Sequence, residues 1–136
     1  VRSVRERHDG KKRNPYNEFE CGSNYARSMA SFALIPILSG FTFDVPHKFI
    51  GFSPVKDENN FRAPFYLGEN WGIFETKENK ATLEMKSGIL SLDRIKLGMA
   101  KKIVSAKADG VSVEISECGE FEKTVNVKDS LIIEYN

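Results

Sequence analysis

Three ionised side chains that could bind a polar ligand lie next to a long apolar stretch of this chain. Glu18 and Glu20 precede Gly22, and Arg27 follows it at the start of the apolar stretch. Burying carboxylates and a guanidinium beside apolar side chains is costly unless these groups pair with one another or bind something polar. The residues therefore predict either an internal ion pair or a polar-ligand site, and both interpretations stay open.

The glycine decides whether Glu18 and Arg27 can cooperate. On one continuous helix, nine residues at about 100° each would place them on opposite sides. If the chain breaks at Gly22 and a helix starts at Ser23, the preceding segment can fold back and direct Glu18 to the same spot as Arg27. Arg27 would then lie in the first helical turn, where the helix dipole disfavours a cation, so another interaction must favour it there.

A sugar is the polar ligand that suits these groups. Carboxylates accept hydrogen bonds from adjacent hydroxyls, a guanidinium donates in a fixed fork, and aromatic rings cover the apolar face of a sugar ring. Candidate sugar contacts besides the charged pair are Tyr16, Glu20 and Trp71, with Tyr25 and Phe65 as further conceivable platforms. For any single aromatic residue, packing in a core is the more common role.

Other chemistries have little support in the sequence. His8 and His47 have no neighbouring Ser or Cys in a nucleophile elbow, and no His-x-x-x-His or clustered Asp pattern indicates a metal site. Glu18 and Glu20 are too close in sequence to be assigned as the opposed acid and nucleophile of a glycosidase. We therefore expect no catalytic residue, no metal and no cofactor in this chain.

Composition narrows the class of protein. With 136 residues, 40% hydrophobic and 29% charged, the chain has the size of one ordinary domain with its own core. The net charge of +1 hides a basic segment over residues 1–13, but this segment lacks interleaved aromatic residues, so a solvated arm is favoured over a nucleic-acid partner. The longest apolar run, residues 32–38, is far shorter than the ~20 residues of a membrane span.

Cysteine usage and the first residue add two expectations. Cys21 and Cys118 match no metal spacing, so two thiols are the preferred interpretation and one disulfide stays open. The cellular compartment does not follow from this, although the cytoplasm is slightly favoured. Because the chain begins at Val1 in the middle of a pattern, we expect it to be part of a longer protein.

The apolar stretch predicts a helix over residues 23–39 that ends at a Ser-Gly pair and is kinked in its last turn by Pro36. Almost no charged face remains on this helix, and a helix that is apolar all round belongs inside a larger assembly. We therefore expect the isolated chain to associate with itself through Phe32, Ile35 and Leu38.

The rest of the chain changes character along its length. Residues 41–74 are rich in Phe, Pro and Gly without clear periodicity and suggest irregular loops with short strands. From residue 81 onward, short alternating runs predict an antiparallel meander or half of a β-sandwich. The turn signals that separate these runs are Ser87-Gly88, Asp109-Gly110 and Cys118-Gly119. The expected organisation is thus α+β, with a helix-and-loop part over residues 1–78 and a β part over residues 79–136. The predicted strands are Thr82–Lys86, Leu90–Leu92, Val111–Ile115 and Leu131–Tyr135.

Several runs together resemble a known enzyme family. Residues 14–22 read Asn-Pro-Tyr-Asn-Glu-Phe-Glu-Cys-Gly, and residues 25–31 read Tyr-Ala-Arg-Ser-Met-Ala-Ser. With Leu-Ser-Gly-Phe at 38–41, these runs resemble the carboxyl-terminal part of the catalytic region of glycoside hydrolase family 116, which includes the non-lysosomal glucosylceramidases, or bile-acid β-glucosidases. The resemblance covers residues 5–97. Further matching runs are Ile50–Pro54, Asn60–Arg62 and Trp71–Phe74.

This resemblance implies an (α/α)₆ toroid with a β-sandwich packed on it, and hydrolysis of β-glucosides or glucosyl lipids with retention of configuration. The catalytic Glu and Asp of the family lie upstream of the matched motif, so the chain alone would be inactive. Glu18 and Arg27 match the family's pair that holds glucosyl hydroxyls in the −1 subsite. The alternative is a non-catalytic β-rich module that binds carbohydrate or a protein through the aromatic-rich residues 41–74.

Overall fold

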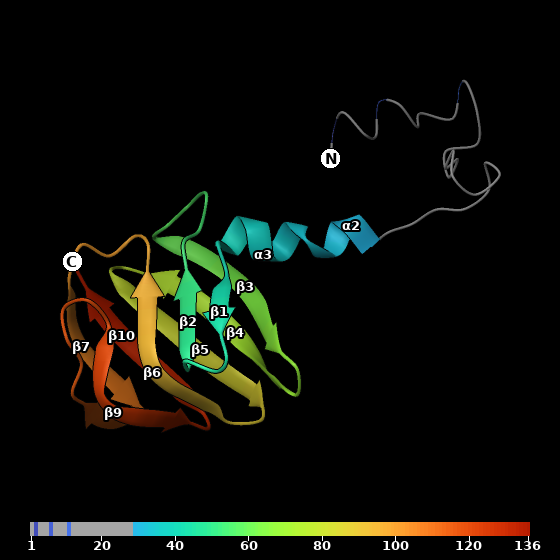
Figure 1. Cartoon of the computed structure of the whole chain (residues 1–136). Helices are drawn as coiled ribbons and strands as arrows, with labels where there is room; N and C mark the ends of the chain where they lie inside the picture. The colour runs from blue at the N-terminus through green and yellow to red at the C-terminus, as the bar shows by residue number, and fades with distance from the viewer. Residues whose placement is uncertain (1, 3–5, 7–10, 12–28) are drawn as a thin grey trace. The chain divides into compact units, whose positions relative to one another are not determined.

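The computed structural model describes residues 2, 6, 11 and 29–136 of the chain, and Figure 1 shows it as a cartoon. The chain divides into two compact units, residues 1–33 and residues 34–136, which are described separately. The first unit contains the short helix α2 (Met29–Phe32). The second contains all the strands.

Helix α3 (Leu34–Ser39) ends at the Ser-Gly pair that the sequence predicts as its stop. Gly40 has a left-handed φ of +58°, which costs glycine little. Its amide donates to the Ile37 carbonyl at 3.2 Å, and the amide of Phe41 donates to the Pro36 carbonyl at 3.0 Å. This pair of hydrogen bonds is a Schellman cap, and it turns the chain from the helix into the first strand.

The single helix expected over residues 23–39 is interrupted at Ala33 in the described part of the chain. Pro36 explains why the helix is interrupted at Ala33, because proline cannot donate a hydrogen bond to the carbonyl of Phe32 and its ring crowds that carbonyl. The disruption thus precedes the proline, whereas the sequence placed a kink in the last turn. The expected start at Ser23 lies outside the described residues.

Residues 42–135 contain ten strands in two sheets. In Figure 1, strands β1, β2 and β6 of one sheet lie in front of strands β3, β4 and β5 of the other. A four-stranded sheet has the order β1-β2-β6-β9, and a six-stranded sheet has the order β3-β4-β5-β10-β7-β8. The strands are β1 (Thr42–Asp44), β2 (Phe49–Phe52), β3 (Asn60–Leu67), β4 (Asn70–Lys77), β5 (Lys80–Ser87), β6 (Leu90–Leu97), β7 (Ile103–Ala108), β8 (Val111–Val113), β9 (Glu120–Val127) and β10 (Ser130–Tyr135).

Neighbouring strands are antiparallel with one exception among the described pairs. Strands β2 and β6 run parallel, from Phe49 opposite Arg94 to Phe52 opposite Leu97. The β1–β2 hairpin therefore joins its sheet by pairing with β6. Strands β3, β4 and β5, which belong to the other sheet, lie between β2 and β6 in the sequence. Parallel neighbours require such a long connection, because a tight turn cannot join them.

Alternating side chains face the space between the sheets, as the period of a strand requires. In β5, for example, Ala81, Leu83 and Met85 are buried and the residues between them face outward. Strands from both sheets contribute such residues to one continuous apolar cluster. The antiparallel β-rich part of the expected fold is therefore confirmed, in the form of a complete two-sheet sandwich.

Aromatic rings hold the centre of this core. Phe52 from β2 and Phe74 from β4 stack with centroids 3.8 Å apart and ring planes inclined by 3°. Phe65 from β3 meets Phe52 edge-on at 5.7 Å, and the Phe41 ring lies 5.3 Å from that of Phe52. Because β2 and β4 belong to different sheets, the Phe52–Phe74 pair directly joins the two layers.

The boundary expected between residues 78 and 79 falls inside the sandwich. Glu78 and Asn79 form the two-residue turn of the β4–β5 hairpin, with positive φ of 51° and 61°. Residues 60–67 and 70–77 form two eight-residue strands, β3 and β4, whereas the sequence suggested irregular loops with short strands over residues 41–74. Proline and glycine inside these strands obscured their alternation.

The helical toroid is not part of what the described residues show. Apart from α2 and α3, the elements described between residues 29 and 136 are strands. Among the described residues, no helix has the length and apolar character needed to cross a membrane.

Candidate functional site

Most of the predicted sugar contacts lie outside the described residues. Glu18 and Arg27, together with Tyr16 and Glu20, belong to this group, so their convergence stays a prediction. Of the candidate sugar contacts named from the sequence, the structure places Trp71, which lies near the start of β4. The further conceivable platform Phe65 is only 1% exposed and belongs to the core, so its ring cannot meet a ligand.

Trp71 forms an aromatic pair with Tyr66 on the outer face of the six-stranded sheet. The two residues are directly opposite in the β3–β4 ladder, so their side chains leave the same face. Their rings stack with centroids 5.9 Å apart and planes inclined by 20°. The Tyr66 side chain is 58% exposed and Trp71 is half-buried. The pair is thus a cross-strand ring contact at a partly exposed position of the sheet.

The backbone around this pair is held by its neighbours. Strands β3 and β4 are joined by a two-residue turn in which Gly68 has a φ of +65°, a conformation that favours glycine. The Asn70 side-chain oxygen accepts a hydrogen bond of 3.0 Å from the amide of Ile89, which ties this hairpin to the start of β6. A β-bulge between Trp71 and Gly72 shifts the register with β5. Such bulges re-aim a side chain locally.

Charged side chains follow the aromatic pair along the same face. The Arg62 Nε lies 3.3 Å from the Glu75 carboxylate, and these residues are opposite each other two rungs further along the ladder. On β5, Lys86 pairs with Glu84. The four side chains are all between 38% and 63% exposed, so their remaining donors and acceptors are open to solvent. These four side chains are two cations and two anions, and the exposed Lys77 and Lys80 add two further cations to the same face of β4 and β5.

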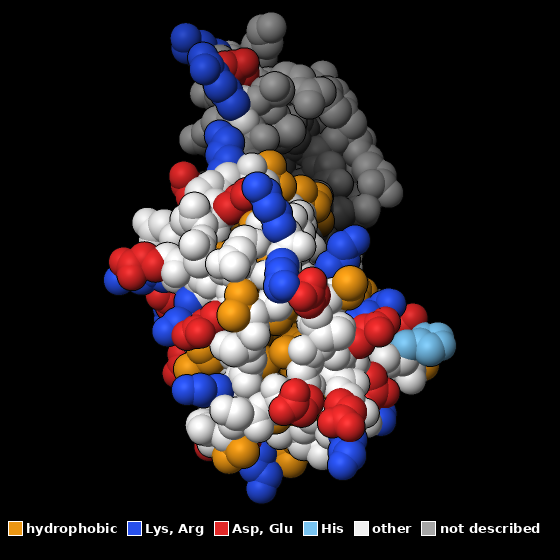
Figure 2. Space-filling model, turned by 90° about the vertical axis from the view of Figure 1, so that its left-hand side faces the viewer, with side chains coloured by type: hydrophobic (Ala, Val, Ile, Leu, Met, Phe, Trp, Pro, Cys, Tyr) orange, Lys and Arg blue, Asp and Glu red, His pale blue; other side chains and the backbone are white. Residues whose placement is uncertain are grey.

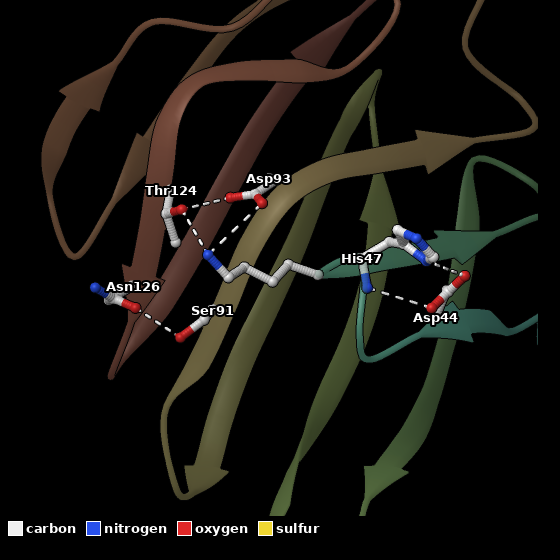
Figure 3. Close-up of polar contacts among 7 residues, drawn as sticks. Asp44, His47, Ser91, Asp93, Thr124 and Asn126 are labelled. Carbon is white, nitrogen blue, oxygen red and sulfur yellow. Dashed lines mark hydrogen bonds and ion pairs between the residues drawn. The ribbon is translucent and has the colours of Figure 1, made fainter.

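The outer face of the four-stranded sheet carries a different polar cluster (Figure 3). The Lys48 ammonium donates to Thr124 Oγ1 at 2.9 Å and lies 3.6 Å from the Asp93 carboxylate. Thr124 Oγ1 in turn donates to Asp93 at 2.5 Å. The three side chains come from the β1–β2 turn, β9 and β6, so together they connect strands across the sheet. Each group has its partner within the cluster, which is the pattern of a structural link.

Asp44 and His47 form a second polar pair at the β1–β2 turn (Figure 3). The His47 Nδ1 lies 2.8 Å from the Asp44 carboxylate, and the side chain of His47 is 80% exposed, as a lone loop histidine is expected to be. The hydrogen bond from the His47 side chain is the main cause that lowers the pKa of Asp44 below its ordinary value. The pair resembles the base and orienting acid of a triad, but no described serine or cysteine bonds to it.

Two open depressions mark the surface of the sandwich. One of about 500 Å³ lies between β8 and β9, with an apolar floor that includes Val113 and Val125 and a rim that includes Glu114 and Lys123. The other, of about 370 Å³, lies where β1, β2 and β6 meet and is lined by Gly40, Thr42, Gly51, Phe52, Ser53, Lys96 and Gly98. Neither contains a cluster of groups with catalytic chemistry among its lining residues.

The remaining expectations concern charge, metals and thiols. On the face shown in Figure 2, basic and acidic side chains of the described residues are interspersed without a large patch of one sign. The described residues contain no group of three or more His, Cys, Asp or Glu that could hold a metal ion. Cys118 is a free, exposed thiol, and Cys21 lies outside the described residues.

Comparison with known proteins gives no family assignment: no protein-family model matches the chain, and no curated protein matches it.

Sequence reasoning named Trp71 but missed Tyr66 as its partner. The signal was present in the Gly-Glu dipeptide at 68–69, which follows Tyr66-Leu67 and can close a two-residue hairpin. That turn would have placed Tyr66 opposite Trp71.

Proposed function

We propose that this chain forms part of a longer retaining β-glycosidase that acts on β-glucosides or glucosyl lipids. In this proposal Glu18 and Arg27 hold hydroxyls of the glucosyl unit, and the β-sandwich of residues 42–135 is an accessory layer beside the catalytic region. The catalytic nucleophile and acid/base belong to a part of the protein outside this chain, so the chain alone does not turn over substrate.

The observation that carries the proposal is the apolar surface of α3 (Leu34–Ser39), which lies within the stretch that resembles the glycosidase family. The exposed fractions of its large side chains are 38% for Leu34, 43% for Ile35, 62% for Ile37 and 50% for Leu38. A helix that only had to pack on the sandwich would place polar residues on its outer side. Exposed apolar side chains on several sides of one short helix instead support packing against further helices, as in a helical toroid.

The test uses the full-length protein and an aryl β-glucoside. Glu18→Ala and Arg27→Ala should each lower kcat/KM at least tenfold, because each removes a hydrogen-bonding group that positions the sugar. Glu114→Ala and Arg94→Ala remove the same charges at exposed sites of the sandwich and serve as matched controls with unchanged kinetics. Unchanged kinetics in both Glu18→Ala and Arg27→Ala, with the wild type active, would overturn the assignment of these residues.

The non-catalytic module remains the second candidate because of one observation, the exposed Tyr66–Trp71 pair. The module and the glycosidase fragment predict different results for glucose release and for the Glu18→Ala and Arg27→Ala variants. A full-length protein that binds carbohydrate without releasing glucose, and whose binding survives Glu18→Ala and Arg27→Ala, would favour the module.

A further inference from the structure

We propose that the free edge of β9, together with the groove between β8 and β9, binds an extended peptide that adds a strand to the four-stranded sheet. The proposal assigns a polypeptide partner to a surface of the second compact unit. It is independent of the proposed glycosidase function, because Glu18 and Arg27 take no part in it.

Of the four edge strands in the two described sheets, β9 offers the longest uninterrupted edge. Strands β1 and β8 have three residues each, and β3 carries Pro64, which has no amide hydrogen, in its interior. Short strands and proline are the usual means by which proteins protect a sheet edge. Strand β9 has eight residues without proline, and its partner among the described strands is β6 on one side only.

Hydrogen bonds near the start of β9 show which backbone groups face the free edge. The Glu122 amide points away from β6, because it donates to the Glu114 carbonyl at 3.2 Å. Backbone direction alternates along a strand, so the amides and carbonyls of Thr124 and Asn126 point to the same edge. No described strand pairs with this part of the edge. The side chains of Thr124 and Asn126 bond to residues of β6 (Figure 3), so the edge presents backbone donors and acceptors to a partner.

The groove beside this edge can take side chains of an added strand. A bridge between Ile115 and Phe121 joins β9 to the chain that follows β8, and the open depression of about 500 Å³ lies between β8 and the later part of β9. Ala108, Val113 and Val125 are its apolar lining. Val113 and Val125 are half-buried, so an apolar side chain laid over them would remove apolar surface from water.

Two opposed carboxylates at the joined end of the groove favour a cationic residue in the partner. Glu114 and Glu122 are exposed and lie opposite each other, next to the bridge between the two strands. Like charges directly opposite on neighbouring strands repel each other. Neither carboxylate forms an ion pair among the described residues, whereas Glu120 has Arg94 opposite it on β6. A lysine or arginine placed beside Glu122 would relieve the repulsion.

Two lysines near the groove refine this partner. Lys123 alternates with Glu122 along β9 and lines the groove. An inward charge on an edge strand disfavours pairing with a purely apolar strand, so we expect the partner to carry a carboxylate opposite Lys123. Lys107 is opposite Ser112 in the β7–β8 ladder and does not line the groove. The partner is therefore an extended peptide with apolar residues, one acidic residue and one basic residue at its end.

The test titrates the 136-residue chain with a capped hexapeptide, Val-Thr-Val-Thr-Asp-Lys, designed to run antiparallel to residues 122–127. In this register the peptide's lysine is opposite Glu122, its aspartate is opposite Lys123, and its threonines are opposite Thr124 and Asn126. Nuclear magnetic resonance should show saturable shifts of the Thr124 and Asn126 amides. Hydrogen exchange of these two amides should slow by about tenfold or more at saturation, because they become hydrogen-bonded.

Matched peptides and variants separate backbone pairing from other contacts. N-methylation of the two peptide threonines removes the amides that face β9 and should abolish binding, whereas N-methylation of the two valines, whose amides face away, should keep binding within about threefold. Glu114→Gln combined with Glu122→Gln should weaken binding by about tenfold. Glu69→Gln, at an exposed position of the β3–β4 turn, is the control with unchanged binding.

Circular dichroism of each variant establishes that the sandwich is folded. Absence of a saturable shift at millimolar peptide would overturn the proposal, and so would equal binding of the two N-methylated peptides. If the Thr124 and Asn126 amides of the peptide-free chain become more protected as protein concentration rises, a second copy occupies the edge and the proposal is overturned. Glu18→Ala and Arg27→Ala should bind the peptide as the wild type does, so this test and the glycosidase test can fail separately.

Discussion

The stacked Phe52–Phe74 pair gives the sharpest stability prediction, because it joins the two sheets at the centre of the core. The Phe74 side chain is 0% exposed and its ring lies 3.8 Å from that of Phe52. Phe74→Ala should lower the free energy of unfolding by about 3–5 kcal/mol, from lost burial and the cavity left behind. A chain of this size is stable by only about 5–15 kcal/mol, so the loss is a large fraction of the total.

The assay is urea unfolding of the 136-residue chain, followed by circular dichroism and by the fluorescence of Trp71. Ile73→Ala is the matched control, since Ile73 is adjacent in sequence but half-buried on the outer face of the same strand. It should cost no more than about 1 kcal/mol. Combining Phe74→Ala with Phe52→Ala should reveal a coupling of about 0.5–1.5 kcal/mol between the stacked rings. A loss for Phe74→Ala equal to that of Ile73→Ala would refute the role of the pair in joining the sheets.

Three further predictions concern turns, pH and association. Gly119→Ala should destabilise the fold by several kcal/mol more than Gly110→Ala, as measured by urea unfolding. Both glycines have a positive φ, but of the two only Gly119 would bring a Cβ to 1.9 Å from a backbone oxygen. Equal losses of stability in the two variants would contradict this prediction. Hydrogen bonds from the backbone amides of residues 128 and 130 are the main causes that lower the Asp109 pKa below its ordinary value of 3.8, so this carboxylate stabilises the fold above that pH. Stability should fall as the pH drops through the folded-state pKa, and Asp109→Asn should lessen that fall in pH-dependent unfolding. Ile35→Glu should shift the sedimentation of the isolated chain from self-associated toward monomeric species; a wild-type chain that sediments as a monomer would refute association through α3.

Local turn and strand chemistry was readable from particular residues. Asp109-Gly110 predicted a tight turn, and the structure has a β7–β8 hairpin there, with φ of 48° and 82° at the two positions. The Ser-Gly pair at the end of α3 predicted its stop, since glycine adopts the left-handed cap without strain. The strands predicted over Thr82–Lys86 and Leu131–Tyr135 lie within β5 and β10 and pair with each other.

Other strands escaped the sequence because their patterns are weaker or interrupted. Strand β7 over Ile103–Ala108 and strand β9 over Glu120–Val127 were not predicted, and β9 has charged residues and threonine where it faces solvent. Pro64 and Gly72 lie inside β3 and β4, and they contributed to the interpretation of residues 41–74 as irregular loops with short strands. Glu18 and Arg27 remain a prediction from the sequence.

What the sequence by itself determined is local: an antiparallel β-rich carboxyl-terminal half, its tight turns and a capped apolar helix. These follow from the side-chain period of strands and from the backbone freedom of glycine, which act over a few residues. Only the tertiary structure decided that β2 pairs in parallel with β6, that Phe52 stacks on Phe74 between the sheets, and that Tyr66 meets Trp71 on an outer face. These contacts depend on which strands become neighbours. That choice rests on the packing of the whole core, which no short stretch of sequence specifies.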